Sequence, residues 1–105
     1  MNPGLLNANI AIVVFKRNGC PACEEYVPRF CALAQPYTSC IPIFILEADD
    51  PKHTPLADRL HVNAIPATFL LQRPHGVMSY IGSVDNNTIA GILDLAAKKA
   101  TCQIP

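Results

Sequence analysis

The stretch from Ile10 to Cys23 reads IAIVVFKRNGCPAC and sets the architecture of the whole chain. Its first part, up to Phe15, is a continuous apolar run rich in β-branched residues, which is typical of a buried parallel strand. Polar residues and a glycine follow, as in a loop that leaves such a strand. Pro21 then suits the first turn of a helix, where its missing N–H costs nothing. The stretch therefore predicts a strand, a loop and a helix, with two cysteines at the junction.

The helix that begins at Pro21 is expected to continue to about Gln35 and to be ended by Pro36. Pro28 lies inside it and should kink it, because a proline removes one backbone hydrogen bond. Glu24 and Glu25 favour its amino end, which is the positive end of the helix dipole. Its apolar residues recur at helical spacing and are Val27, Phe30, Cys31 and Ala34.

The remaining apolar runs complete an alternating pattern of strands and helices. They predict strands over Ile41–Leu46, Ala67–Gln72 and Val77–Ile81, a short helix over Leu56–His61, and a last helix capped by Asp85 and Asn86. The expected order is β-α-β-α-β-β-α, which is an α/β fold with a central mixed four-stranded sheet flanked by helices. The first two strands must be parallel across a right-handed crossover, and the last two must be antiparallel.

Composition excludes several classes of protein. The chain has 105 residues, 50% of them hydrophobic and 15% charged, which fits one folded domain over residues 1–105. Its formal net charge is zero, so no basic surface indicates a nucleic-acid partner. Met1 to Asn9 lack the features of a secretory signal, and the run from Ile10 to Phe15 is too short to span a membrane. We therefore expect a soluble, cytoplasmic protein.

The Cys20-Pro21-Ala22-Cys23 motif predicts dithiol–disulfide exchange. A cysteine at a helix start lies beside unsatisfied backbone N–H groups, which favour the thiolate that acts as nucleophile. The second cysteine lies one turn away, where it can attack a mixed disulfide and release product. We interpret Cys20 as the nucleophile and Cys23 as the resolving thiol. Lys16 and Arg17 would favour the thiolate, while Glu24 and Glu25 would oppose it.

Two plainer interpretations of the cysteines stay open. A zinc site would require Cys20, Cys23, Cys31 and Cys40 to converge, and idle core cysteines would require nothing. The odd total of five cysteines argues against a secreted disulfide framework. We expect Cys31 and Cys40 to be small buried hydrophobes and Cys102 to be exposed and free, although a regulatory disulfide among these three is possible. Tyr26 is expected to face solvent and is assigned no role.

From the CPAC motif onward, the chain resembles the thioredoxin family. Pro28 follows the second cysteine where thioredoxins have a kinking helix proline. The segment VNAIPATF, residues 62–69, looks like the family's cis-proline segment, and Tyr80-Ile81-Gly82 resembles its late strand and glycine. The resemblance covers nearly everything after residue 9 and implies a thioredoxin-like fold. The strand and helix that open full-length thioredoxins are expected to be reduced or absent.

The resemblance also implies a substrate groove. It implies that the Ile65–Pro66 peptide bond is cis, with the backbone of Ile65 beside Cys20 to pair with an extended substrate, and that Gly82 leaves room for that peptide. The residues we expect to line this groove are Gly19, Pro21, Ala22, Ile65, Pro66 and Gly82. The plainer alternative is that Pro66 starts a strand and Gly82 bends one.

The chain departs from thioredoxins in ways that bear on its activity. It has no tryptophan, and Gly19 stands where thioredoxins carry one. Val14 replaces a buried acid thought to help deprotonate the resolving thiol, and Phe44 falls near the lysine that partners that acid. Resolution by Cys23 is then slower or uses another base. The short N-terminal segment and the proline after the first cysteine are glutaredoxin-like.

Three functions follow from this sequence. The leading one is a monomeric protein dithiol–disulfide oxidoreductase, a reductase of protein disulfides, recycled by a thioredoxin-reductase-type flavoenzyme or by glutathione. It needs no bound cofactor or metal. The alternatives are a redox-weak binding adaptor that kept the groove, and a glutathione-dependent glutaredoxin-like enzyme. The reduction potential and the natural substrate are not fixed by the sequence, because both depend on how the site is built.

Overall fold

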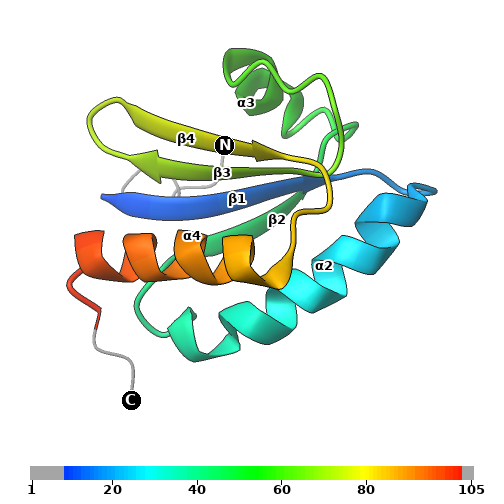
Figure 1. Cartoon of the computed structure of the whole chain (residues 1–105). Helices are drawn as coiled ribbons and strands as arrows, with labels where there is room; N and C mark the ends of the chain where they lie inside the picture. The colour runs from blue at the N-terminus through cyan, green and yellow to red at the C-terminus, as the bar shows by residue number, and fades with distance from the viewer. Residues whose placement is uncertain (1–8, 103–105) are drawn as a thin grey trace.

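A mixed four-stranded sheet forms the centre of the computed structural model, which describes residues 9–102 (Figure 1). The strands lie in the order β2-β1-β3-β4. Their bounds are Ile10–Lys16 for β1, Ile43–Glu47 for β2, Ala67–Gln72 for β3 and Gly76–Ile81 for β4. β1 pairs parallel with β2, whereas β3 pairs antiparallel with both β1 and β4. The predicted α/β fold and strand directions are confirmed. The sequence also predicts a turn at Asn2-Pro3-Gly4 and a short helical turn over Leu5–Asn9, but residues 1–8 lie outside the described part of the chain.

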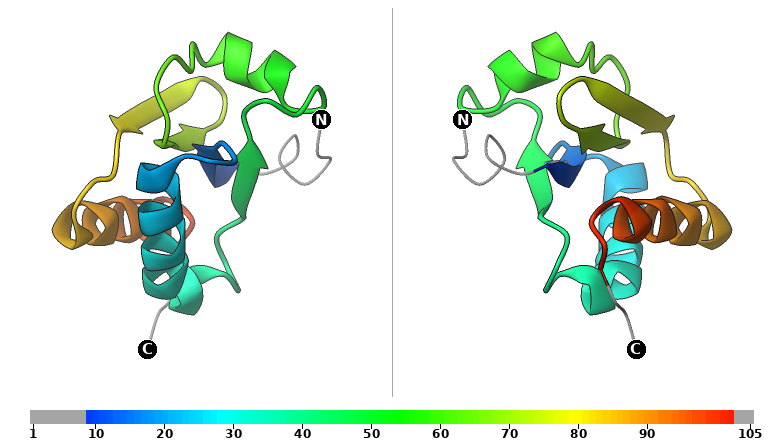
Figure 2. Two further views of the ribbon diagram at one scale, coloured as in Figure 1. Left: turned by 90° about the vertical axis from the view of Figure 1, so that its right-hand side faces the viewer. Right: turned by 90° about the vertical axis from the view of Figure 1, so that its left-hand side faces the viewer.

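Helices cover both faces of this sheet (Figure 2). α2 (Pro21–Ala34) and α4 (Asn86–Lys99) lie on one face, and the short α3 (Thr54–Arg59) lies on the other. A 3-10 turn, η1 (Gln35–Tyr37), follows α2 directly. Two apolar clusters fill the layers, one beneath α2 and α4 and one beneath α3. The sheet therefore separates two cores, and its two central strands, β1 and β3, contribute side chains to both.

β1 is the best-protected strand because it has neighbours on both edges and helices on both faces. Ile12 to Phe15 are fully buried, and alternate side chains contribute to the two cores. An uninterrupted apolar run is the pattern that such a position requires. Fully burying one such side chain stabilises the fold by roughly 1.5–3 kcal/mol, so this run anchors the sheet.

Several element boundaries differ from those predicted, and three of them lie next to a proline. β2 begins at Ile43, because Pro42 has no N–H to give the ladder, although its carbonyl accepts from the Ile12 N–H at 2.9 Å. α3 begins at Thr54, since Pro55 fits its first turn. α2 ends at Ala34, and Pro36 lies within the 3-10 turn that follows.

The sheet register brings three connecting segments to one end of the molecule. Phe15 pairs with Ala67, and Ala67 pairs with Ile81. The loop after β1, the segment before β3 and the turn after β4 therefore lie at the same end of the strands, on the right of Figure 1. The amino end of α2 lies at this end of the sheet too.

Candidate active site

Cys20 is the N-cap residue of α2, the position at which the sequence predicts the nucleophile. Its backbone is extended (φ −102°, ψ 105°), and its Sγ accepts a hydrogen bond from the Cys23 N–H at 3.1 Å. The Glu24 N–H donates to the Cys20 carbonyl at 3.0 Å. A sulfur at this position receives N–H groups that the helix leaves free, and these groups stabilise negative charge. The helix start therefore favours a thiolate at Cys20.

Cys20 and Cys23 are bonded as a disulfide, with Cα atoms 5.2 Å apart. Cys23 is buried (2% exposed), whereas Cys20 is half-buried between an exposed glycine and an exposed proline. A substrate disulfide approaching from solvent therefore meets the sulfur of Cys20 first. This difference in access agrees with the roles that the motif suggests for the two thiols.

Gly19 turns the chain into this helix start with φ +77°. A side chain there would be strained whatever the space around it, although a Cβ would meet no atom within 4 Å. Glycine therefore supports the backbone turn and leaves the surface beside Cys20 open. Pro21 and Ala22 are also exposed, so the predicted residues on this side of Cys20 form a bare surface.

The nearby cations are engaged by carboxylates. Lys16 Nζ lies 2.8 Å from Glu47 Oε1, and Arg17 Nε lies 3.0 Å from Asp49 Oδ2. Each cation's field at the cysteines is therefore largely offset by its own partner. The backbone at the amino end of α2 contributes positive potential at Cys20 in addition.

A groove of about 290 Å³ runs between the loop after β1 and the first turns of α2. Cys23 and Glu24 line it from the helix, together with Val27 and Pro28. The otherwise buried second cysteine thus borders a space large enough for water.

The peptide bond between Ile65 and Pro66 is cis. Pro66 is buried, and its carbonyl accepts a hydrogen bond from the Gly82 N–H at 2.8 Å. Gly82 has φ +91°, and no atom lies within 4 Å of the position of a Cβ there. The structure thus brings Pro66 and Gly82 together, at the same end of the sheet as Cys20, with half-buried Ile65 beside them.

Tyr26 is completely buried, and the prediction that it faces solvent is wrong. Its hydroxyl forms a 2.8 Å hydrogen bond with the hydroxyl of Thr68, which is also fully buried. Burial raises the pKa of Tyr26, because the phenolate would lose its hydration. Its spacing from Cys23 and Phe30 was the available signal, since these three residues share one face of α2.

Val14, where the resemblance implies a buried acid, has no charged neighbour on the adjacent strands. Val14 lies opposite Thr68 on β3 and Ile45 on β2. Val14 and Phe44 belong to different core clusters on opposite faces of the sheet. The residue next to Val14 on β2 is thus Ile45, and neither it nor Phe44 carries a charge. Cys23 has no carboxylate of this kind to take its proton.

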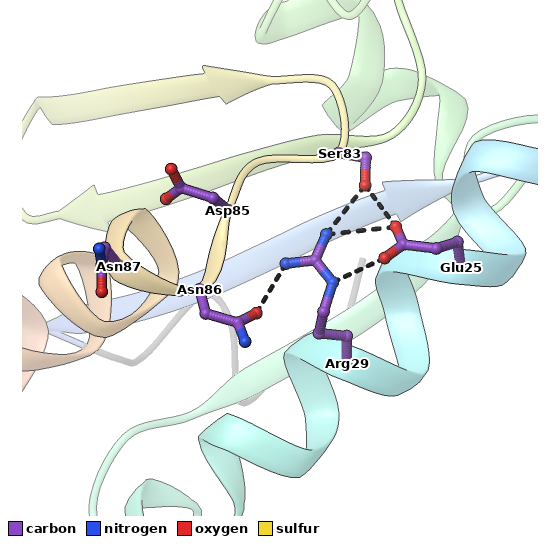
Figure 3. Close-up of a pocket in the computed structure, with 6 residues that line it drawn as sticks. All are labelled: Glu25, Arg29, Ser83, Asp85, Asn86 and Asn87. Carbon is purple, nitrogen blue, oxygen red and sulfur yellow. Dashed lines mark hydrogen bonds and ion pairs between the residues drawn. The ribbon is translucent and has the colours of Figure 1, made fainter.

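Arg29 joins α2 to the turn after β4, a connection that the sequence did not suggest (Figure 3). Its guanidinium donates to the Val84 carbonyl at 2.7 Å, to Asn86 Oδ1 at 2.8 Å and to Ser83 Oγ at 3.0 Å. It also pairs with Glu25 at 2.7 Å. Hydrogen bonds from Arg29 and then Ser83 lower the pKa of Glu25. This network holds the segment beside Gly82 against the helix that carries the cysteines.

The other cysteines differ from their predicted states. Cys31 is exposed and free, because the face of α2 that packs on the core carries its neighbour Phe30. Cys102 is half-buried and bonded to Cys40, rather than exposed and free. The four cysteines required by the zinc interpretation do not converge, and among residues 9–102 no three metal-ligating side chains are grouped to hold an ion. Within the same residues, no helix combines the length and apolarity needed to cross a membrane.

Comparison with known proteins places these features in a family. Residues 4–95 match the sequence profile of the thioredoxin family. A search of curated proteins found no match. Similar solved structures include the germline-specific thioredoxin Deadhead of Drosophila melanogaster, with 19% identity, TM-score 0.71, and coverage of 87% of this chain and 84% of that one. Mitochondrial thioredoxin 3 of Saccharomyces cerevisiae has 20% identity, TM-score 0.70, and coverage of 84% and 80%. Malassezia sympodialis thioredoxin has 13% identity, TM-score 0.74, and coverage of 85% and 76%.

Proposed function

The chain belongs to the thioredoxin family and is a thiol–disulfide oxidoreductase, and on this basis we propose that it reduces protein disulfides through Cys20 and Cys23. The observation that carries the proposal is the position of Cys20. Its sulfur caps α2 and accepts a backbone hydrogen bond, and it is more accessible than its partner. A stabilised, reachable thiolate is what disulfide exchange requires of its nucleophile.

The reaction consists of two exchanges. The Cys20 thiolate attacks one sulfur of a substrate disulfide, so that a Cys20–substrate bond forms and the second substrate sulfur leaves as a thiolate. The Cys23 thiol then loses its proton and attacks the Cys20 sulfur, which closes the Cys20–Cys23 disulfide and releases the first substrate sulfur. The substrate gains two electrons and takes up two protons, while the enzyme pair is oxidised. A thioredoxin-reductase-type flavoenzyme or glutathione returns the electrons.

The proposed substrate groove lies around Cys20. Gly19, Pro21 and Ala22 form its bare surface on the helix side. Ile65, Pro66 and Gly82 lie at the same end of the sheet, and support for their role comes from the Pro66–Gly82 hydrogen bond and the open space at Gly82. An extended peptide there would pair with the backbone of Ile65. We propose that one chain acts as a monomer, since both thiols and the groove belong to it.

The second exchange is the slower step in this proposal. Val14 stands in place of the family's buried acid, so β1 offers Cys23 no carboxylate, and its proton goes into the adjoining groove, which Glu24 also lines, or to the departing substrate thiolate. A reductase also needs a compartment whose reductants keep both thiols reduced. We therefore propose that the protein works in the cytoplasm.

Insulin reduction coupled to dithiothreitol tests the proposal. Wild type is expected to accelerate the reaction, and Cys20→Ser is expected to reduce it to the rate of dithiothreitol alone. Cys31→Ser is the matched control, because that thiol is on the same helix, exposed and free. Equal rates for wild type and Cys20→Ser would overturn the proposal. Turnover of a glutathione mixed disulfide in place of insulin would assign the chain to the glutaredoxin-like alternative.

The adaptor alternative is favoured by Val14 standing in place of the family's buried acid, and a titration distinguishes it from the reductase. We expect the thiolate absorbance of the reduced Cys23→Ser variant to rise with a midpoint below ~8.5, the value of free cysteine. The Cys20→Ser/Cys23→Ser variant supplies the baseline from Cys31 and other groups. A Cys20 midpoint at or above the free-cysteine value would favour an adaptor.

A further inference from the structure

A second disulfide lies outside the proposed exchange centre. It joins Cys40, between η1 and β2, to Cys102, just past the end of α4, and spans 62 residues of sequence. The two Cα atoms are 5.7 Å apart, within the usual range of disulfides. Both cysteines are half-buried and pack against the core beneath α2 and α4. The bond is therefore part of the packed structure.

Electrostatics distinguish this pair from Cys20 and Cys23. The Cys102 N–H donates to the Ala97 carbonyl at 2.8 Å, so Cys102 closes the carboxyl end of α4, the negative end of its dipole. The sulfur of Cys40 lies 3.7 Å from the Tyr37 carbonyl oxygen. Both surroundings disfavour a thiolate, and the exposed side chains of Lys98 and Lys99 offset this only in part. Exchange at this pair is therefore slow, and its reduced form gains little stabilisation.

The backbone beside Cys102 needs support. Thr101 has φ +51°, a left-handed conformation that is rare for a β-branched residue. Its N–H donates to the Lys98 carbonyl at 3.3 Å, and the hydrogen bond of Cys102 follows, which together form a helix-ending motif usually built with glycine. The disulfide fixes the residue immediately after this turn. It thereby stabilises a left-handed turn at the end of α4 that a β-branched residue does not favour.

A second contact links the same two parts of the chain. The Tyr37 hydroxyl in η1 donates to Asp94 Oδ1 of α4 at 3.0 Å. Asp94 is exposed, so this bond alone contributes little. The covalent bond and this contact together join the end of α4 to the segment that leads into β2, which is an edge strand of the sheet.

Distance isolates this pair from the exchange centre. Cys20 caps the amino end of α2, and Cys40 follows the η1 turn beyond its carboxyl end. Along a helix of 14 residues this separation is roughly 21 Å. The two ends of α2 lie well apart in Figure 1. Direct exchange requires sulfur atoms in contact, so one pair cannot pass electrons to the other within a molecule.

We propose that Cys40 and Cys102 form a structural disulfide that staples the end of α4 and stays closed while Cys20 and Cys23 are reduced and reoxidised. It forms at the expense of a disulfide oxidant such as oxidised glutathione. One cysteine thiolate attacks that disulfide and expels a glutathione thiolate, and the other cysteine then displaces the second. The pair loses two electrons and two protons, and two molecules of reduced glutathione are produced.

A redox titration of isolated pairs tests the staple independently of catalysis. The triple variant Cys20→Ser/Cys23→Ser/Cys31→Ser retains Cys40 and Cys102 from the chain's five cysteines. It is equilibrated in glutathione buffers, and free thiols are trapped with a maleimide and counted by mass. We expect its disulfide to open at a ratio of reduced glutathione squared to oxidised glutathione at least about tenfold higher than that of Cys20–Cys23 in Cys31→Ser/Cys40→Ser/Cys102→Ser. Two free thiols in oxidised glutathione, or opening at an equal or lower ratio, would overturn the proposal.

Disulfide mapping of a single-site variant, Cys31→Ser, provides a second measurement that does not depend on how the triple variant folds. Trypsin digestion of oxidised Cys31→Ser without reductant should yield residues 30–52 linked to residues 100–105, because these peptides carry Cys40 and Cys102. The link should persist after Cys20 and Cys23 have been reduced by limited dithiothreitol. In addition, Cys40→Ser/Cys102→Ser should reduce insulin within about twofold of the wild-type rate while its Tm falls by about 10 °C or more. Absence of the linked peptide, or its loss together with the Cys20–Cys23 bond, contradicts the staple.

Discussion

The two cysteine pairs occupy contrasting places on the helices. Cys20 lies at an amino end, where a backbone N–H donates to its sulfur at 3.1 Å, and its partner is three residues away. Cys102 lies at a carboxyl end, and its partner is 62 residues away. Helix polarity favours a thiolate at the first site and disfavours one at the second. The same bond type thus suits exchange in one place and structural closure in the other.

Loop length gives the comparison its largest measurable effect. In the chain-entropy description, a disulfide that closes 62 residues stabilises the fold by about 4 kcal/mol, whereas one that closes three stabilises it by about 1.5 kcal/mol. Urea unfolding of the oxidised proteins should therefore show a larger loss for Cys40→Ala/Cys102→Ala than for Cys20→Ala/Cys23→Ala. A loss that is equal, or larger for the second variant, would show that the two bonds do not divide their roles in this way.

A tyrosine lies near each pair, and the two form a matched set. Tyr26→Phe leaves the buried hydroxyl of Thr68 without its 2.8 Å partner, so we expect a loss of about 1–3 kcal/mol of unfolding free energy. Tyr37→Phe removes a hydrogen bond to an exposed carboxylate at 3.0 Å, which water replaces, and should cost about 0.5 kcal/mol or less. Chemical denaturation measures both. A larger loss for Tyr37→Phe would mean that the hydrogen bond near Cys40 and Cys102 stabilises the fold more than the buried one.

The end of α4 offers a smaller effect of opposite sign. Thr101→Gly removes the cost of a β-branched residue at φ +51°, and we expect a gain of about 0.5–1 kcal/mol in the oxidised protein. Ala100→Gly is the control, because Ala100 has a right-handed helical backbone and gains nothing from glycine. The measurement is the urea midpoint of both variants. A loss of stability in Thr101→Gly would show that the side chain supports this turn.

The smallest expected effect concerns pH at the exchange end. Arg29 and Ser83 hold the pKa of Glu25 below its usual 4.5. A carboxyl with a lowered folded pKa contributes stability above its unfolded pKa, and this contribution is lost as pH falls through the folded value. Between about pH 5 and about pH 3, the Tm of wild type should therefore fall slightly more than that of Glu25→Gln. Glu24→Gln is the control on the same turn. Parallel curves for wild type and Glu25→Gln would show that the charge of Glu25 does not stabilise the folded protein.

Much of this architecture follows from local patterns. The apolar run in β1 and the helix-start cysteines have local causes, so the strand, the helix and the position of Cys20 can be read from neighbouring residues. The buried face of α2 is harder to predict, because helical spacing alone allows a face with Cys31 as well as the face with Tyr26 that is observed. The residues covering the helix decide which of them is buried. In this structure the buried face of α2 consists of Cys23, Tyr26, Phe30 and Ala34.

By itself, the sequence determined the order of the elements and the exchange motif, because strand periodicity, proline positions and helix capping depend on residues close together in the chain. Only the tertiary structure paired Cys40 with Cys102, Tyr26 with Thr68 and Arg29 with the turn after β4. The partners in these contacts are 42 to 62 residues apart. No local rule selects such partners. They are chosen when the helices pack on the sheet and bring distant side chains within bonding distance.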